Sequence, residues 1–146
     1  MNVKILNINY IVNGLLTEIH TKMFYKHNEN KIQDIYFEFT LGKNNIKSQK
    51  NNSMEYAIKS LQKSLPSNIN MACCQSCNYG NFCPYGDNEN EIFCLKDIIL
   101  KDEQDVCEFF VNNIDCIQDK RKSLLGSCKD YKPISQGNYY TYNDWE

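Results

Sequence analysis

Apolar and polar residues alternate through the first forty positions of the chain. The alternation runs over residues 3–12, and after Asn13-Gly14 it resumes over residues 15–25. A period of two is typical of a β-strand with one buried face. Because an Asn-Gly pair accepts the positive φ angles of a two-residue turn, the sequence predicts a β-hairpin. A third alternating run, residues 35–41, predicts a third antiparallel strand.

Two later segments have the apolar spacing of helices. In residues 54–65 the apolar positions share one helical face, Asn52 and Glu55 form an N-cap-like pair, and Pro66 closes the segment. A second helix is expected over residues 102–118, with acidic residues at its start that suit the helix dipole. Short buried strands are expected at residues 92–96 and 98–100.

These patterns predict an α+β fold in which an N-terminal antiparallel β-meander is covered by two helices, with a cysteine-rich loop between the helices. A length of 146 residues fits a single domain, 1–146. Its expected parts are the meander plus first helix (1–65), the cysteine-rich loop plus second helix (66–133) and a tail (134–146).

Composition and charge narrow the classes of partner. Hydrophobic residues make up 42% of the chain and charged residues 23%, which is typical of a folded protein. The net charge of −2 does not favour nucleic acid or an anionic membrane as a partner. No stretch approaches the roughly 18 apolar residues that span a bilayer, and no export signal is visible. We therefore expect a cytoplasmic protein.

Eight cysteines are present, and in a reducing compartment we do not expect them to form disulfides. Clustered cytosolic cysteines bind metal or react more often than they form disulfides. Cys74-Gln75-Ser76-Cys77 has the spacing of half a zinc site, because two sulfurs separated by two residues can converge on one tetrahedral ion. A secreted disulfide framework is the alternative if the chain is a mature fragment.

The other half of such a site must come from distant cysteines. Cys94 and Cys128 are candidates, and Cys83, in a Cys-Pro-x-Gly turn, competes as the third ligand. Cys73 adjoins Cys74, and neighbouring residues point in different directions, so we expect only Cys74 to be a ligand. Cys107 and Cys116 are interpreted as packing residues at the edge of the second helix.

Three segments carry a resemblance: Cys74-Gln75-Ser76-Cys77-Asn78-Tyr79, then Cys94, then Cys128-Lys129-Asp130-Tyr131-Lys132-Pro133. Together they resemble small bacterial and phage cysteine-rich proteins of unknown function, with a CxxC-x-Tyr pattern, a middle cysteine and a closing Cys-x-x-Tyr-x-Pro. The resemblance covers only the C-terminal half, and Cys83 departs from it. It implies a four-cysteine metal site made by Cys74, Cys77, Cys94 and Cys128.

Zinc is the metal expected for four thiolates. An iron–sulfur cluster uses the same ligands, but the spacing does not match the common ferredoxin runs. Buried cysteines with no metal are the plain alternative.

Catalysis is not favoured, and no catalytic residue or nucleotide-binding motif is identified. Phosphate-loop, dinucleotide and HExxH motifs are absent, and both histidines, His20 and His27, are expected to be exposed. The favoured function is a small zinc-stabilised binding or accessory domain. The alternative is a thiol redox enzyme or sensor that uses the Cys73-Cys74-Cys77 cluster. A protein partner would bind the loop from Asn78 to Asn90 or the aromatic tail, whose residues are Tyr139, Tyr140, Tyr142 and Trp145.

Overall fold

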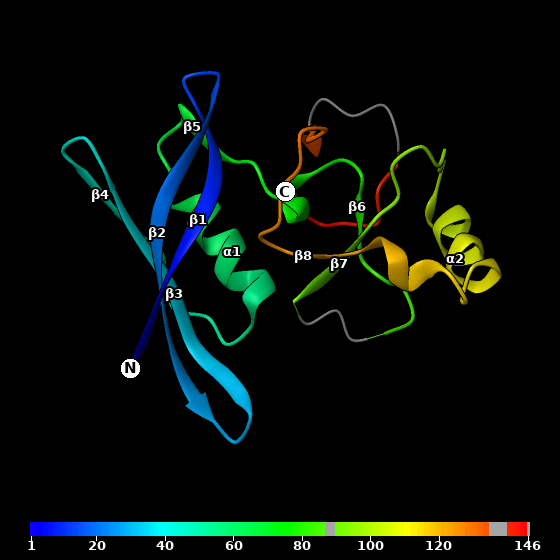
Figure 1. Cartoon of the computed structure of the whole chain (residues 1–146), viewed down its shortest axis with the longest axis horizontal. Helices are drawn as coiled ribbons and strands as arrows, with labels where there is room; N and C mark the ends of the chain where they lie inside the picture. The colour runs from blue at the N-terminus through cyan, green and yellow to red at the C-terminus, as the bar shows by residue number, and fades with distance from the viewer. Residues whose placement is uncertain (87–89, 135–139, 146) are drawn as a thin grey trace. The chain divides into compact units, whose positions relative to one another are not determined.

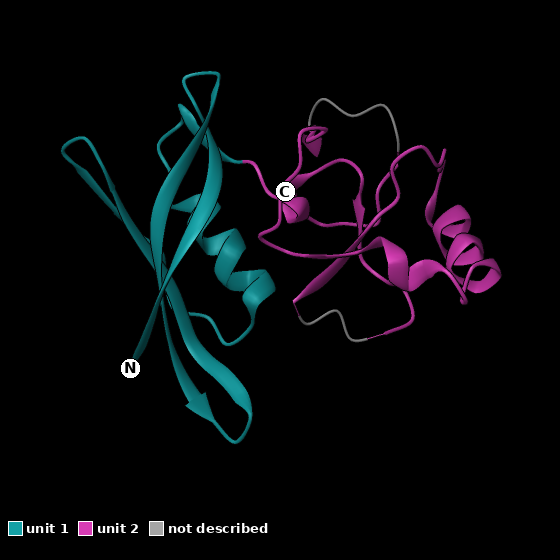
Figure 2. Cartoon of the chain, viewed as in Figure 1, with its two compact units in different colours: residues 1–71 teal, residues 72–146 magenta. Residues whose placement is uncertain are grey.

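The computed structural model describes residues 1–86, 90–134 and 140–145, and it has the predicted α+β fold class. The chain divides into two compact units, Met1–Met71 and Ala72–Glu146 (Figure 2). The first unit contains the meander and the first helix, and the second contains the cysteine-rich loop and the second helix. No helix in the described ranges has the length and hydrophobicity to cross a membrane.

The predicted hairpin is confirmed. Strand β1 (Asn2–Val12) pairs antiparallel with β2 (Leu15–Asn28), and Val12 lies opposite Leu15 (Figure 1). Asn13 and Gly14 connect them with φ angles of 51° and 83°, the positive values that a type I′ turn requires. The local pair therefore sets the register of the longest ladder in the molecule.

The sheet has five strands rather than the three expected. The predicted third strand, β3 (Lys31–Leu41), pairs with β2 through a register shift between Phe24 and Lys26. Two strands that were not predicted extend the edges, β4 (Asn44–Lys47) beside β3 and β5 (Ile69–Met71) beside β1. The resulting antiparallel order is β4-β3-β2-β1-β5.

Helix α1 (Met54–Lys63) packs against this sheet through its buried residues Ala57, Ile58 and Leu61. The predicted cap was wrong by one position: the N-cap is Ser53, whose hydroxyl accepts the Tyr56 backbone N–H at 3.3 Å. The Asn52 side chain instead accepts the backbone N–H of Asp34 at 3.2 Å, because the preceding segment is tied to β3.

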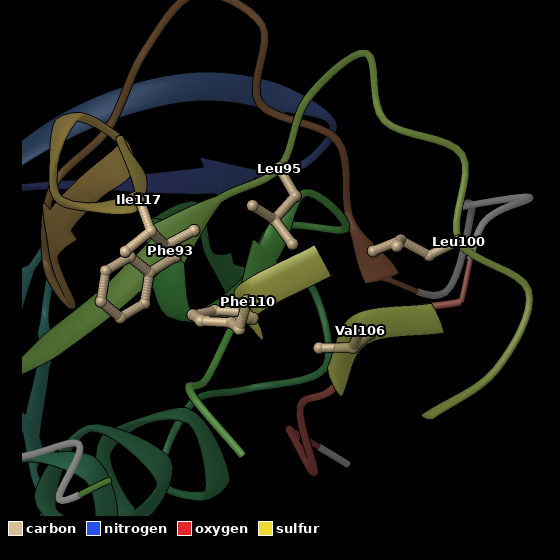
Figure 3. Packing of buried hydrophobic residues seen from close by; sticks show 6 residues of the cluster. All are labelled: Phe93, Leu95, Leu100, Val106, Phe110 and Ile117. Atoms are coloured by element: carbon tan, nitrogen blue, oxygen red, sulfur yellow. The ribbon is translucent and has the colours of Figure 1, made fainter. Parts of the chain in front are cut away.

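The second unit contains a small sheet of order β6-β7-β8, made of β6 (Gly80–Asn81), β7 (Glu91–Cys94) and β8 (Arg121–Ser123). Helix α2 (Glu103–Asn112) packs on a core drawn in Figure 3, in which Phe93 of β7 meets Phe110 edge to face at a centroid distance of 5.2 Å. The buried cluster comprises Phe93, Leu95, Leu100, Val106, Phe110 and Ile117.

Two expectations in this unit were wrong. The second helix ends at Asn112 rather than Gln118, because the Asn113 side chain donates a hydrogen bond to the Phe109 carbonyl at 2.8 Å and so satisfies a helix-end acceptor. Ile114 is consequently exposed, and a short 3₁₀ turn, η2 (Ile117–Lys120), follows. Residues 98–100 form no strand; Asp97, at φ 70°, lies in a turn three residues after the end of β7.

The described part of the tail lies against the second unit. The Tyr142 carbonyl accepts the Phe82 backbone N–H at 2.9 Å, and the Tyr142 N–H donates to the Asn81 side chain at 2.6 Å. The Tyr142 ring also packs on the buried cluster. Tyr139, named above as part of an aromatic patch, lies outside the described residues.

Candidate metal centre

A single 3₁₀ turn, η1 (Cys74–Ser76), shapes the Cys-x-x-Cys segment. The Cys77 backbone N–H donates to the Cys74 carbonyl at 3.3 Å, which closes the turn between the two cysteines. The backbone of the turn also bonds to a distant segment: the Cys74 N–H donates to the Gly126 carbonyl at 2.7 Å and the Asn78 N–H to the Lys132 carbonyl at 2.6 Å. These bonds hold the turn beside the segment that carries Cys128.

The small sheet places the third cysteine. Cys94, the last residue of β7, pairs with Gly80 of β6, three residues after Cys77. A Cβ on Gly80 would stand 2.4 Å from the Cys74 carbonyl oxygen, so only glycine allows the loop to fold back this closely. A Cβ on Gly126 would stand 3.3 Å from Cys74 Sγ. Two glycines therefore leave room around the Cys74 backbone and sulfur.

Four cysteines from three segments line one cavity of about 140 Å³. They are the four that the resemblance implied, Cys74, Cys77, Cys94 and Cys128. Lys96 and Lys122 line the same cavity and add positive charge beside the thiols. In chemical type, four thiols facing a common space suit a soft divalent cation.

Burial and nearby thiols oppose ionisation of two of these cysteines, Cys74 and Cys77. Burial, together with smaller contributions from the thiols of Cys73, Cys77, Cys128 and Cys94, raises the pKa of Cys74 to about 12. Burial also raises the pKa of Cys77, although the backbone N–H groups of Lys132 and Tyr79 donate hydrogen bonds to its sulfur and act in the opposite direction. Without a cation, burial therefore favours the protonated form of Cys74 and Cys77.

The side chains do not form a closed coordination shell as they stand. Over residues 1–86, 90–134 and 140–145, no group of three or more His, Cys, Asp or Glu side chains is arranged to hold a metal ion. The four cysteines share a cavity, and the thiols would have to draw together around an ion.

The structure separates the other cysteines from this cavity. The Cys73 side chain is fully buried, with its sulfur 3.7 Å from the Ser76 hydroxyl, and it does not line the cavity. Cys83, the competing third ligand, packs against the apolar cluster instead. Cys107 is half-buried. Cys116 is exposed, so its interpretation as a packing residue was wrong; the helix that would have buried it ends four residues earlier.

An ion pair that the sequence reasoning missed joins two of the cysteine segments. Lys96 Nζ lies 2.8 Å from Asp130 Oδ2, and each residue stands two positions after a cavity cysteine, Cys94 and Cys128 respectively. The hydrogen bond raises the pKa of Lys96 and lowers that of Asp130. The sequence did contain a signal for this ion pair: two residues of opposite charge each stand two positions after a candidate ligand. His20 and His27 are both exposed on β2, as expected.

The chain matches no protein-family model, no curated protein and no solved structure.

Proposed function

We propose that the second unit is a zinc-stabilised binding or accessory domain, in which Cys74, Cys77, Cys94 and Cys128 hold one zinc ion. The observation that supports this is their convergence: residues up to 54 positions apart in the sequence line one cavity. If these cysteines served only as small apolar packing residues, we would not expect four of them to line one cavity together with two lysines.

Zinc would supply the positive charge that stabilises four buried thiolates. Zn²⁺ takes four thiolates at about 2.3 Å in a tetrahedron, and its positive charge would offset the cost of burying the Cys74 and Cys77 thiolates and their mutual repulsion. The Tyr79 and Lys132 N–H groups already donate to Cys77 Sγ, as outer-shell donors do around metal-bound thiolates. Lys122 would partly balance the net negative charge of a four-thiolate site, whereas the charge of Lys96 is already paired with Asp130.

The donor set favours a structural rather than a catalytic role. Catalytic zinc sites keep a position open for water or substrate, whereas four protein thiolates fill the tetrahedron. The ion would cross-link the Cys-x-x-Cys turn, the end of β7 and the segment after β8. That cross-link would stabilise a unit whose strands are only two to four residues long.

The deciding experiment is elemental analysis of the purified full-length protein. We expect about one equivalent of zinc per chain, and faster loss of zinc to a competing chelator in Cys128→Ser than in wild type. Cys116→Ser is the matched control, because Cys116 is also an exposed cysteine but lies outside the cavity. Less than about one-tenth of an equivalent of metal, with the thiols of Cys74, Cys77, Cys94 and Cys128 freely reactive, would refute the proposal.

The same analysis distinguishes zinc from an iron–sulfur cluster. Iron and acid-labile sulfide in place of zinc, with visible absorption, would identify the cluster that the same four thiolates can ligate.

The redox alternative receives less support. A catalytic or sensing thiol needs a lowered pKa and access to solvent. In this structure burial raises the pKa of Cys73, Cys74 and Cys77, and Cys73 has no exposed surface. Selective reaction of one of these three with a limiting alkylating agent at neutral pH would support the redox role instead.

We propose that a protein partner binds the exposed part of the loop from Asn78 to Asn90. Asn78, Asn81 and Phe82 are buried, whereas Tyr85 is 64% exposed and its hydroxyl is hydrogen-bonded to Cys107. Tyrosine is a common anchor in interfaces. A cytoplasmic location follows from the same proposal, since a reducing compartment keeps the ligands available.

A further inference from the structure

Strand β1 has one edge that is free over most of its length. The strand pairs with β2 along its whole length on one side, whereas β5 pairs with the other side only at residues 10–12. Over residues 3–7, no partner on this second side is present in the part of the chain that the structure describes. A row of unpaired backbone N–H and C=O groups is a template on which another strand can add.

The register of the hairpin shows which residues direct their backbone groups to this edge. Successive residues of an antiparallel strand direct their N–H and C=O groups to opposite sides. Val12 and Leu15 close the two-residue turn, so Val12 and the other even-numbered residues of β1 bond to β2. The next residue, Asn13, donates its N–H at 2.9 Å to Asn68, which immediately precedes β5. The odd-numbered residues therefore face the free edge, and they are Val3, Ile5 and Asn7.

The side chains along this edge leave it open to another strand. Val3 is 52% and Ile5 63% exposed, and alternation places both on the face of the sheet opposite to buried Ile8. Edge strands are commonly shielded by proline, by a bulge or by charged side chains. Residues 3–7 contain neither proline nor a register shift, and Lys4 is their one charge. The usual protection of an edge is therefore slight here.

We propose that two copies of this chain associate through β1, antiparallel and around a two-fold axis at Ile5. Ile5 then lies opposite Ile5 of the second copy, and Val3 lies opposite Asn7. The free groups of both strands meet in register and form about six backbone hydrogen bonds, two for each of three residue pairs. Val3 and Ile5 lose water-exposed apolar surface at the same time.

Neighbouring registers are less favourable. A shift of one residue sets each free backbone group opposite one that already bonds to β2. A shift of two residues one way sets Lys4 opposite Lys4 of the second copy, and like charges directly opposite each other are destabilising. The same shift the other way sets Asn2 opposite Tyr10, which already pairs with Met71 of β5. The strand therefore favours the pairing centred on Ile5.

Closure favours one second copy over an open chain of copies. Once two β1 edges have paired, this edge is no longer free, and assembly stops at a dimer. The outer edge at β4 is only four residues long and ends in Lys47, so it is better protected. The inference does not rest on the proposed zinc site, because residues 1–71 contain no cysteine.

The first test is analytical ultracentrifugation of the full-length protein from about 1 to 200 µM, with and without a chelator. We expect the mass to rise from 17.1 kDa toward twice that value, with the same profile in both conditions. A monomer at every concentration, growth beyond a dimer, or a dimer that chelation dissociates would each overturn the proposal. A dimer without bound zinc would support it and would refute the metal site alone.

Two matched variants separate edge pairing from contact between sheet faces. Ile5 and Leu16 are both 63% exposed and lie on the same face of the sheet, but Leu16 belongs to β2. Ile5→Lys sets two like charges against each other at the axis and should weaken the dimer about tenfold. Leu16→Lys should leave the dimer unchanged, and both variants should keep the wild-type melting temperature at the lowest concentration. Equal weakening by both variants, or by neither, would overturn the proposal.

Residue-resolved amide hydrogen exchange reads the backbone pairing directly. We expect the N–H groups of Val3, Ile5 and Asn7 to exchange quickly in the dilute monomer and slowly in the dimer. Those of Leu6 and Ile8 should be slow in both, because they bond to β2. Fast exchange of the odd-numbered residues at the highest concentration would overturn the pairing. Slow exchange of these residues in the monomer would show that another part of the same chain covers the edge, and would overturn it too.

Discussion

The residues that shape the cysteine cavity most strictly are two glycines. Gly80 brings β6 against the Cys74 carbonyl, and Gly126 leaves room for the Cys74 sulfur. Neither has the positive φ that marks a glycine turn, so their role is close approach rather than backbone freedom. In the sequence both glycines lie within three residues of a cysteine, but their close approach to Cys74 depends on the tertiary structure and cannot be read from spacing.

Gly80→Ala is therefore expected to destabilise the second unit strongly. The added Cβ would meet a backbone oxygen at 2.4 Å, which cannot rotate away, and overpacking of this kind costs about 1–3 kcal/mol or more. Gly86→Ala is the matched control, since its Cβ would meet only the Cys83 sulfur, at an ordinary 3.9 Å. Chemical denaturation measures both, and equal stability of the two variants would contradict the packing described at Gly80.

The thiols also predict opposite pH responses with and without zinc. In the metal-free protein the pKa of Cys74 is raised from 9.0 to about 12, so the folded state keeps a proton that the unfolded state loses. Stability is then lost as pH rises from 9.0 toward 12. In the zinc-bound protein, protons compete with the metal, and stability is lost as pH falls below neutrality. Melting temperatures across pH, with and without chelator, measure both signs; identical profiles would contradict the metal site.

Helices and strands that have a clear local pattern in the sequence were predicted correctly, and strands without such a pattern were missed. The hairpin follows from long alternation and from Asn13-Gly14, all within 28 residues. Strand β5 is three residues long and pairs with β1 across nearly sixty positions, so no local pattern identifies it. The second helix was drawn too long because its apolar spacing continues through Ile114, whereas the Asn113 side chain closes the last turn.

The cysteine site likewise combines one local signal with features that depend on the tertiary structure. The Cys74-x-x-Cys77 pair is a local signal. Cys94 and Cys128 were candidates from the sequence, the resemblance implied them as the remaining ligands, and in the structure they line the same cavity as the pair. Spacing alone left Cys83 open as the third ligand. The tertiary structure distinguishes the two, because Cys94 lines the cavity whereas Cys83 packs on the apolar cluster.

The start of α2 offers a test of one element. Asp102 is its N-cap, and its carboxylate accepts the Asp105 backbone N–H at 2.9 Å. Asp102→Ala should reduce the free energy of unfolding of the second unit by about 1 kcal/mol. Asp115→Ala removes an equally exposed carboxylate beyond the end of the helix and should change little. Equal effects would mean that net charge, rather than capping, explains the loss.

At the scale of the whole molecule, a net charge of −2 conceals two units of opposite sign. Residues 1–71 contain nine lysines against five acidic residues, and residues 72–146 have an acidic excess of six. The units also differ in how they are stabilised. The first has a five-stranded sheet with a helix packed on it, whereas the second has short strands and a compact cluster of six buried apolar residues.

A metal cross-link should consequently matter to one unit only. Small domains with limited cores commonly depend on metal, and removing the ion removes its binding free energy from folding. Chelation of the full-length protein should therefore abolish slow amide hydrogen exchange in the second unit, including β7 and α2, while β1, β2 and β3 stay protected. Exchange read by mass spectrometry before chelation, after it and after zinc is restored measures this. Protection that persists in β7 and α2 without metal would show that the apolar cluster alone stabilises the second unit.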